Sequence, residues 1–245
     1  MPRFFIDPDK IADGAVYLEK EDAHHARDVL RVKPGEQMTV ADFFNKEYLC
    51  TVVRADGDGV LLSIREVRDG ASEPPFPVTL LMGLPKGDKP ELIVEKAVEL
   101  GAGEIVFFTS RYTVVRCDEK TAAKKGERYQ KIAKSAAQQC GRGMIPRADA
   151  PVTFREALDR YKDRSALKLI CYEKEEQTTL RQALERAPAP DGIVFMVGAE
   201  GGFSPEEAAA AKDAGFLPVT LGGRILRCET APLCVLSQIA YHYGY

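Results

Sequence analysis

The sequence predicts an α/β protein in which a small β-barrel precedes a larger domain built on a mainly parallel sheet. A proline-rich stretch at 71–77 separates two differently patterned regions and is typical of a semi-rigid linker. Short β-rich segments with turn signals precede the linker, which indicates a small barrel. Apolar runs of strand length alternate with helical stretches after it, which favours parallel strands connected by helices. We therefore expect one domain at 1–70 and a second at 78–245.

The N-terminal region is expected to hold one helix, at 21–30, and five strands. Turn residues at 33–35 and 56–59 separate neighbouring strands. The expected strands follow apolar and β-branched runs at 3–6, 15–18, 37–44, 48–53 and 60–67.

The C-terminal region is expected to alternate between strands and helices. The run 193–197 is apolar without interruption, as in a strand that is buried on both faces. A final helix is expected to begin near Thr230, with Pro232 in its first turn. The expected strands of the sheet are 78–84, 104–109, 167–172, 193–197 and 217–221.

Two glycine-containing segments follow the last two expected strands. The first glycine segment is Gly198-Ala199-Glu200-Gly201-Gly202-Phe203-Ser204, and a helix should follow it, because Ser204, Pro205 and Glu207 form the pattern of a capping box with proline at the first helical position. The second glycine segment is Leu221-Gly222-Gly223-Arg224-Ile225-Leu226-Arg227-Cys228-Glu229-Thr230-Ala231. One such loop alone would be explained by tight turns. The carboxyl ends of parallel strands meet at one edge, so the two segments should face one crevice, where backbone without Cβ atoms can approach a ligand.

Composition and known motifs narrow the class of ligand. Neither segment has the spacing of a dinucleotide fingerprint or of a P-loop, which argues against NAD and nucleoside triphosphates. The six cysteines form no C-x-x-C pair, so we expect no zinc site or disulfide framework, and mostly buried, reduced thiols. His24 and His25 are adjacent, point in different directions on a helix and complete no metal site. No run of apolar residues could span a membrane and the start lacks a signal-peptide pattern, so we expect a cytoplasmic protein.

Positive charge is concentrated in one stretch, although the whole chain has a formal net charge of -3. Between Arg111 and Arg147 there are ten basic and three acidic residues, a local balance of +7. This pattern fits either a solvated helix face or a patch that neutralises phosphates. Gln139 and Arg142, three residues apart, are expected on one face of the basic helix, where they could hold a base or its phosphate.

Taken together, the two glycine segments resemble the paired signature of a bacterial ribosomal RNA methyltransferase family of the SPOUT class, whose members methylate N3 of one uridine, position 1498 in 16S rRNA. The likeness extends over nearly the whole chain, through Lys86–Lys89, 91–101 and 135–142 to Arg3-Phe4-Phe5 and 24–31. The family usually has proline where this chain has Ala199, and threonine where it has Cys228.

The resemblance implies a PUA-like RNA-binding barrel, a SPOUT α/β domain with a deep trefoil knot, and a homodimer with the active site completed across the interface. The implied cofactor is S-adenosyl-L-methionine, with its adenine near Leu221 and Leu226, and the implied partner is 16S rRNA or the small ribosomal subunit. No metal is implied. The implied cofactor-binding residues are Gly198, Glu200, Gly201, Gly202, Leu221, Gly222, Ile225, Leu226 and Arg227.

Methylation at N3 requires the N3 proton to leave, and negative charge then spreads onto the flanking carbonyl oxygens of the uracil. Arg227 is the first candidate for a cation that stabilises this charge, although it could equally pair with Glu200 or Glu229. These two glutamates are candidate proton acceptors, and Glu200 could instead anchor its loop. A nucleophilic role for Cys228 is unnecessary, because N3 itself attacks once deprotonated. The candidate RNA contacts are Arg27, Arg31, Lys86, Lys89, Arg111, Lys124, Lys125, Lys131, Gln139 and Arg142.

Two other functions fit the same residues. The first is methylation of a ribose 2′-oxygen in ribosomal or transfer RNA by the same fold. The second is a non-catalytic RNA-binding or ribosome-assembly protein with a vestigial cofactor pocket. The identity of the methylated nucleoside would distinguish the first from the N3 reaction, and cofactor titration would test the second.

Overall fold

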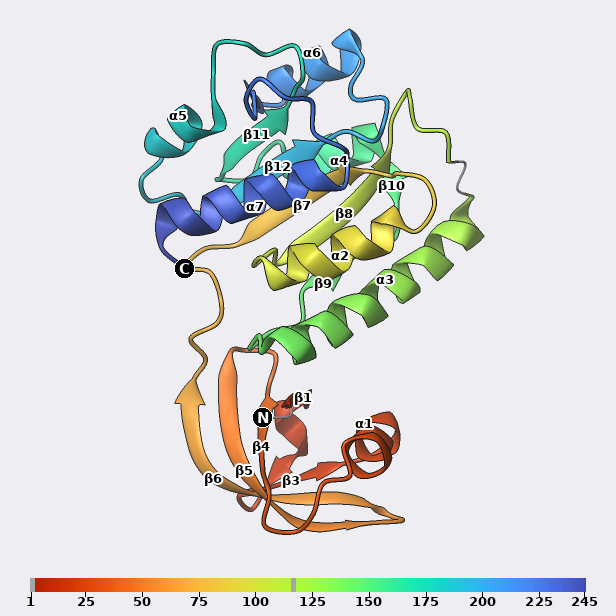
Figure 1. Ribbon diagram of the computed structural model, residues 1–245, viewed down its shortest axis with the longest axis vertical. Helices are drawn as coiled ribbons and strands as arrows, with labels where there is room; N and C mark the ends of the chain where they lie inside the picture. Colours follow the sequence, from red (N-terminus) through yellow and green to blue (C-terminus); the bar gives the residue numbers. More distant parts are fainter. Residues whose placement is uncertain (1–2, 116–117) are drawn as a thin grey trace. The chain divides into compact units, whose positions relative to one another are not determined.

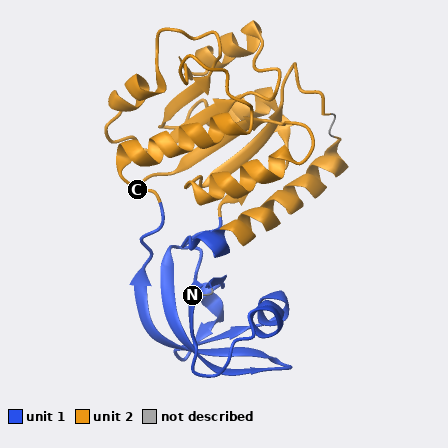
Figure 2. Ribbon diagram, in the orientation of Figure 1, with its two compact units in different colours: residues 1–73, 137–145 blue, residues 74–136, 146–245 orange. Residues whose placement is uncertain are grey.

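The computed structural model describes residues 3–115 and 118–245. Two compact units divide the chain (Figure 2). Unit 1 contains 1–73 and 137–145, and unit 2 contains 74–136 and 146–245. Arg116 of the basic stretch and Cys117 lie outside the described residues.

Unit 1 is built on a six-stranded sheet with the strand order β1-β4-β5-β6-β3-β2. All neighbouring strands are antiparallel except β1 and β4. Phe4, Met38 and Leu62 are fully buried in its core. The elements are β1 (Arg3–Phe5), a 3-10 turn (Pro8–Lys10), β2 (Ile11–Ala12), β3 (Ala15–Leu18), α1 (Lys20–His24), a π-helical turn (His25–Val29), β4 (Gln37–Ala41), β5 (Lys46–Asp56) and β6 (Gly59–Asp69).

The strand expected at 37–44 ends earlier, at Ala41, because the chain turns there. The buried carboxylate of Asp42 accepts hydrogen bonds from the backbone N–H groups of Phe44 and Lys46, both at 3.0 Å. Phe43 has a φ of 66° and Asn45 one of 62°, which strand residues do not adopt. An aspartate side chain that accepts hydrogen bonds from the backbone of its own turn competes with the hydrogen bonds between strands. Here the turn forms and the strand ends.

Unit 1 also includes the chain that follows α3 (Glu119–Cys140). Arg142 is buried and forms an ion pair with Glu73, whose carboxylate also accepts from the N–H groups of Gly143 and Met144. Arg3 donates to the Arg142 carbonyl oxygen at 2.9 Å. The expectation that Arg142 shares a face of the basic helix with Gln139 is therefore wrong, because α3 ends at Cys140. The buried guanidinium of Arg142 is paired with Glu73 instead.

Unit 2 contains a fully parallel sheet with the strand order β10-β8-β7-β12-β11-β13, and β9 also pairs with β8 (Figure 1). The expected strands at 104–109 and 193–197 match their observed bounds, and the other three are shorter at their carboxyl ends. The short β9 and β10 were not predicted. The strands are β7 (Val78–Gly83), β8 (Glu104–Thr109), β9 (Arg147–Ala148), β10 (Val152–Thr153), β11 (Leu167–Cys171), β12 (Ile193–Val197) and β13 (Leu217–Val219).

Helices cover both faces of this sheet. Side chains of one face, among them Leu81, Val106 and Met196, pack with Leu158 of α4 and Ala211 of α6. On the other face α2 and α7 lie side by side (Figure 1). No helix in the described residues is long and apolar enough to cross a membrane. The remaining helices of unit 2 are α2 (Lys89–Glu99), α4 (Phe154–Tyr161), α5 (Leu180–Glu185), α6 (Pro205–Asp213) and α7 (Thr230–Tyr243).

The start of α6 confirms the helix that the sequence predicts after the first glycine segment. The Ser204 side chain accepts from the Glu207 N–H, and the Glu207 carboxylate accepts from the Ser204 N–H at 2.9 Å. Pro205 is the first helical residue. This capping box fixes the direction in which the chain leaves the glycine segment.

Candidate functional site

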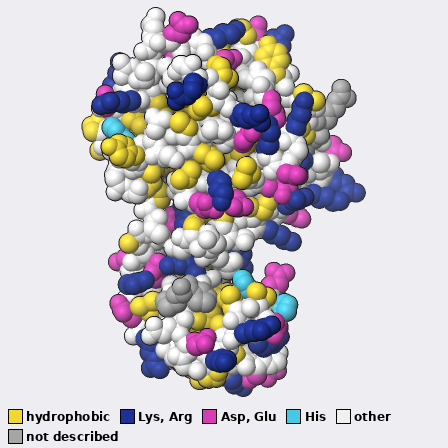
Figure 3. Space-filling view, in the orientation of Figure 1, with side chains coloured by type: hydrophobic (Ala, Val, Ile, Leu, Met, Phe, Trp, Pro, Cys, Tyr) yellow, Lys and Arg dark blue, Asp and Glu magenta, His cyan; other side chains and the backbone are white. Residues whose placement is uncertain are grey.

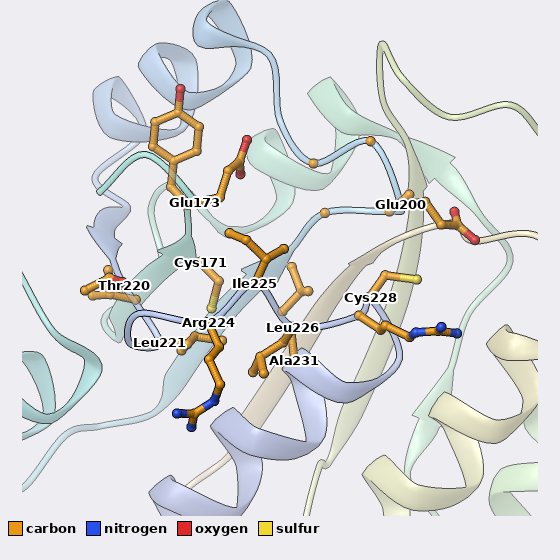
Figure 4. Close-up of a pocket in the computed structure, with 18 of the residues that line it drawn as sticks. Cys171, Glu173, Glu200, Thr220, Leu221, Arg224, Ile225, Leu226, Cys228 and Ala231 are labelled. Atoms are coloured by element: carbon orange, nitrogen blue, oxygen red, sulfur yellow. The ribbon is translucent and has the colours of Figure 1, made fainter. Parts of the chain in front are cut away.

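A cavity of about 530 Å³ lies where β11, β12 and β13 end. These strands are parallel, so their carboxyl ends meet at one edge of the sheet. Residues of both glycine segments line the cavity, so the two segments face one crevice as the topology predicts. In Figure 4, Glu200 and Cys228 lie at one end and Leu221 at the other, with Ile225 between them.

The first glycine segment folds back on itself too closely for side chains. An added Cβ at Gly198 would lie 2.9 Å from the Gly202 Cα. Gly202 has a φ of 65°, and its N–H donates to the Ala199 carbonyl oxygen at 3.0 Å. Backbone rather than side chains therefore forms this wall of the cavity.

Gly201 and Gly222 differ in why they are glycine. An added Cβ at Gly201 would lie 2.6 Å from the Cβ of Tyr112, so a side chain there would displace the segment even with no ligand present. Gly222 has a φ of 108° and no atom within 4 Å of such a Cβ. Its constraint is backbone conformation alone.

An ion cluster joins the two glycine segments. The Lys89 Nζ lies 3.1 Å from Glu200 Oε1 and 3.2 Å from Glu229 Oε2. Glu200 also accepts from the Lys86 N–H at 3.2 Å, and the Cys228 thiol donates to Glu229 Oε2 at 3.2 Å. Lys89, predicted as an RNA contact, thus points at one carboxylate from each glycine segment.

The cluster fixes the charges of its members. Burial alone would raise the pKa of Glu200, but hydrogen bonds from its own N–H and from Lys89 hold it below its ordinary value. The Glu229 pKa is lowered as well, first by its own backbone N–H and further by Cys228 and Lys89. Burial, reinforced by the bond to Glu229, raises the pKa of Cys228 to about 11. Both glutamates are therefore anionic at neutral pH and the thiol is protonated.

Arg227 makes neither of the ion pairs that would give it a structural role. Within the described residues no carboxylate lies in ion-pair distance of its exposed guanidinium, and Lys89 occupies both nearby glutamates. The Arg227 carbonyl oxygen accepts from the N–H groups of Thr230 and Ala231, which fixes its backbone at the start of α7. The side chain is left available for a ligand.

The remaining predicted RNA contacts occupy several places. Lys124 and Lys131 are exposed on α3, and Lys125 is partly buried; lysine and arginine side chains gather at this edge of unit 2 (Figure 3). Arg111 pairs with Glu206 at 3.0 Å. Three further predicted contacts are exposed: Arg31, Lys86 and Gln139. Arg27 forms an ion pair with Asp28 and donates to the Asp56 carbonyl oxygen.

Several residues that line the cavity are absent from the sequence prediction. Cys171 ends β11, and Tyr172 and Glu173 follow it. Thr220 precedes the predicted Leu221, and Arg224 lies between the predicted Gly222 and Ile225. The rule used for the strands at 193–197 and 217–221 also applies to the strand at 167–172, because all three end at one edge. It would have placed Glu173 at the cavity.

No metal-binding cluster occurs among residues 3–115 and 118–245. Their cysteines form no disulfide, and only Cys50 and Cys228 are buried, so the expectation that the thiols are mostly buried is wrong. Cys140 is exposed, while Cys171 and Cys234 are partly buried.

Family models match both parts of the chain. Residues 72–240 match the RNA methyltransferase domain, and residues 18–65 match the RNA methyltransferase PUA domain. The ribosomal RNA small subunit methyltransferase E of Bacillus subtilis is 34% identical, over 98% of this chain and 96% of the relative. The protein of the same name from Synechocystis is 33% identical, over 97% of this chain and 76% of the relative.

Solved structures show the same fold. The ribosomal RNA small subunit methyltransferase E of Neisseria gonorrhoeae, bound to S-adenosyl methionine, has a TM-score of 0.84 and 35% identity, over 98% of this chain and 97% of that one. A methyltransferase from Legionella pneumophila, in complex with the same cofactor, has a TM-score of 0.84 and 31% identity, over 98% of this chain and 96% of that one. With its PUA-like N-terminal domain and its α/β methyltransferase domain, this chain belongs to the family of ribosomal RNA small subunit methyltransferases E.

Proposed function

We propose that this protein transfers the methyl group of S-adenosylmethionine to N3 of one uridine in 16S rRNA, in the cytoplasm. By resemblance the uridine is at position 1498. The observation that carries the proposal is the convergence of both glycine segments on one cavity, in a chain whose relative from Neisseria gonorrhoeae binds S-adenosyl methionine. Position N3 rests on the sequence resemblance, and the ribosomal RNA substrate on the relatives' names.

The residues of the cavity fit this cofactor. Leu221, Ile225 and Leu226 offer an apolar wall for an adenine ring, and the wall around Gly198 and Gly202 is formed by backbone. The volume of about 530 Å³ falls in the range of small-molecule sites. The bound cofactor supplies a methyl group already activated as a sulfonium, so the protein's task is alignment and charge stabilisation.

Arg227 has the position and the freedom to stabilise the uracil anion. Its guanidinium is exposed beside the cavity and free of carboxylates among the described residues. A fixed fork of donors suits the carbonyl oxygens that flank N3, where charge develops as the proton leaves. We assign Arg227 this catalytic role.

Glu200 and Glu229 are weaker candidates for the proton acceptor than the sequence suggests. Their lowered pKa values make both carboxylates poor bases, and Lys89 already holds both. We infer that Arg227 favours loss of the N3 proton to water, while Glu200 lines the cavity and Glu229 pairs with Lys89.

RNA is proposed to bind along α3 and on the PUA-like unit 1. Lys124 and Lys131 are exposed there and can neutralise phosphates, with Lys125 beside them. Arg27 and Arg31 lie on unit 1. These basic side chains can bind phosphates although the whole chain has a negative net charge, because the local charge determines the contacts with phosphates.

We further propose that the segment after β13 forms the deep trefoil knot of the SPOUT class and that the protein is a homodimer. The knot rests on the sequence resemblance alone. For the dimer, the side chain of Tyr241 on α7 is 91% exposed and available for contact with a second copy of the chain. Light scattering at working concentration tests the dimer, and a fully active monomer would contradict it.

The reaction itself is tested with small ribosomal subunits and, separately, protein-free 16S rRNA as acceptors of labelled methyl groups. Nucleosides from the product are then separated and identified by mass spectrometry. A 3-methyluridine product supports the proposal, and a 2′-O-methylated nucleoside supports the ribose reaction instead. Cofactor binding without transfer to either acceptor would favour a binding protein.

A further inference from the structure

Lys89 is the first residue of α2, and its ammonium group reaches both glycine segments. Its Nζ lies 3.1 Å from Glu200 Oε1, 3.2 Å from Glu229 Oε2 and 3.6 Å from Cys228 Sγ. The lysine side chain is 32% exposed. In the described part of the chain no other cation pairs with either glutamate.

The two carboxylates come from different glycine segments. Glu200 lines the cavity from the first glycine segment, and Glu229, at the N-cap of α7, follows the lining residue Cys228 in the second. An ammonium group between them is the electrostatic link between the two glycine segments. Without it, the two anionic side chains would repel each other.

We propose that Lys89 is a positioning residue that holds the two glycine segments at the spacing that the cofactor requires. This inference rests on the proposed function, because the cofactor is the ligand whose affinity reports the spacing. It replaces the RNA contact expected for Lys89. The three donors of the ammonium group already face two carboxylates and a thiol, so none is left for a phosphate.

The first test is calorimetric titration of S-adenosylmethionine into the full-length protein without RNA. Lys89→Met keeps most of the side-chain volume but removes the charge, and we expect roughly tenfold weaker binding, a change of about 1.4 kcal/mol. Lys89→Arg should stay within about threefold of the wild type, because a guanidinium can bridge two carboxylates. Lys96→Met is the matched control, since Lys96 pairs with Glu95 and Glu99 on the same helix but lies outside the cavity.

A charge-specific readout separates this role from general damage to the fold. In Lys89→Met the carboxylates of Glu200 and Glu229 lose their shared cation, so the pKa of one of them should rise. Cofactor affinity should then recover as the pH falls, while the wild-type affinity stays nearly flat between about pH 6 and pH 8. The double variant Lys89→Met/Glu229→Gln, which removes one repelling charge, should bind more tightly than Lys89→Met alone. Cys228 is the remaining titratable group of the cluster, and it stays protonated over this range.

Each outcome decides the inference. Wild-type affinity in Lys89→Met would overturn it, and weaker RNA binding with unchanged cofactor binding would restore the RNA contact. Weaker cofactor binding with no pH dependence and no rescue by Glu229→Gln would also overturn it, as it would indicate local unfolding. If Lys89→Met does not fold, Lys89→Gln and the Glu229→Gln single variant give the same comparison. Failure of the wild type to bind the cofactor would instead refute the proposed function.

Discussion

Arg142 and Glu73 form an ion pair that is almost completely buried, with side chains 5% and 11% exposed. The two residues are far apart in sequence. Glu73 is the last residue of the first part of unit 1, and Arg142 belongs to its second part, 137–145. Glu73 also accepts from the N–H groups of Gly143 and Met144 at 2.9 and 3.2 Å. The Glu73 carboxylate thus pairs with the buried charge of Arg142 and accepts hydrogen bonds from two backbone N–H groups that follow it.

Breaking this pair should destabilise unit 1 strongly. We expect Glu73→Ala to cost about 3 kcal/mol or more in the free energy of unfolding, because it leaves a buried guanidinium without a counter-charge. Glu99→Gln is the control: its pair with Lys96 is partly exposed and should be worth less than about 1 kcal/mol. Urea denaturation and amide hydrogen exchange at 137–145 would measure the difference. Equal losses in the two variants would contradict the importance of burial.

The rate of methyl transfer should depend on Arg227. We expect Arg227→Ala to lose roughly 10²-fold in single-turnover rate, the scale seen when one preorganised donor is removed. Lysine should restore only part of the rate, because it keeps the charge but lacks the planar fork. Arg181→Ala, which removes an exposed arginine paired with Glu185, should leave the rate unchanged. A normal rate in Arg227→Ala would rule out the assigned role.

Gly222 should be sensitive to any side chain through its φ of 108°. Gly222→Val should weaken cofactor binding, because a β-branched residue must leave this conformation and carry the second glycine segment with it. The melting temperature should fall only modestly, since the residue is exposed, the added side chain meets no neighbour and backbone strain alone contributes. Gly201→Val, in contrast, meets Tyr112 and should reduce stability as well. Unchanged affinity in a folded Gly222→Val protein would remove that segment from the binding site.

Charge reversal on α3 should weaken RNA binding and leave cofactor binding intact. We expect glutamate at Lys124, Lys125 and Lys131 to lower RNA affinity and flatten its dependence on salt, because fewer counterions are released. Reversal of Arg155, Lys162 and Lys212, on α4, its C-cap and α6, is the control for total charge. Filter binding over a salt series measures both slopes, and parallel slopes would place the RNA track elsewhere.

Cys228 should be dispensable for the chemistry. Its pKa of about 11 keeps the thiol protonated at neutral pH, so it is not a nucleophile there. Cys228→Ser keeps a donor to Glu229 and should retain most of the transfer rate. A folded but inactive variant, or an RNA adduct trapped on the wild-type enzyme, would refute an N3 mechanism without a covalent intermediate.

Local signals in the sequence were enough to predict the frame of unit 2. Apolar runs located the strands at 104–109 and 193–197, and the cap at Ser204 located α6. The shared edge of parallel strands then placed Gly198 and Gly222 at one cavity. These features depend on neighbours in sequence or on a general rule of topology.

The features that were missed depend on long-range pairing. In the sequence Lys89 cannot be told from a surface lysine, because its partners Glu200 and Glu229 come close to it only in the folded structure. The burial of Arg142 requires Glu73, which no periodicity connects to it. Such pairs form only in the folded structure, so the sequence around either residue does not indicate them.

The strand order of the parallel sheet has a consequence for the chain during its synthesis. Val78 of β7 pairs with Ile193 of β12, so one edge of β7 stays bare while the intervening chain is being made. A bare strand edge is a site for misassociation, and contacts this distant in sequence form slowly. The cavity needs the chain as far as Ala231. A nascent chain of this protein therefore cannot form this cavity until Ala231 has been made, and binding of a ligand there reports that the sheet of unit 2 has assembled.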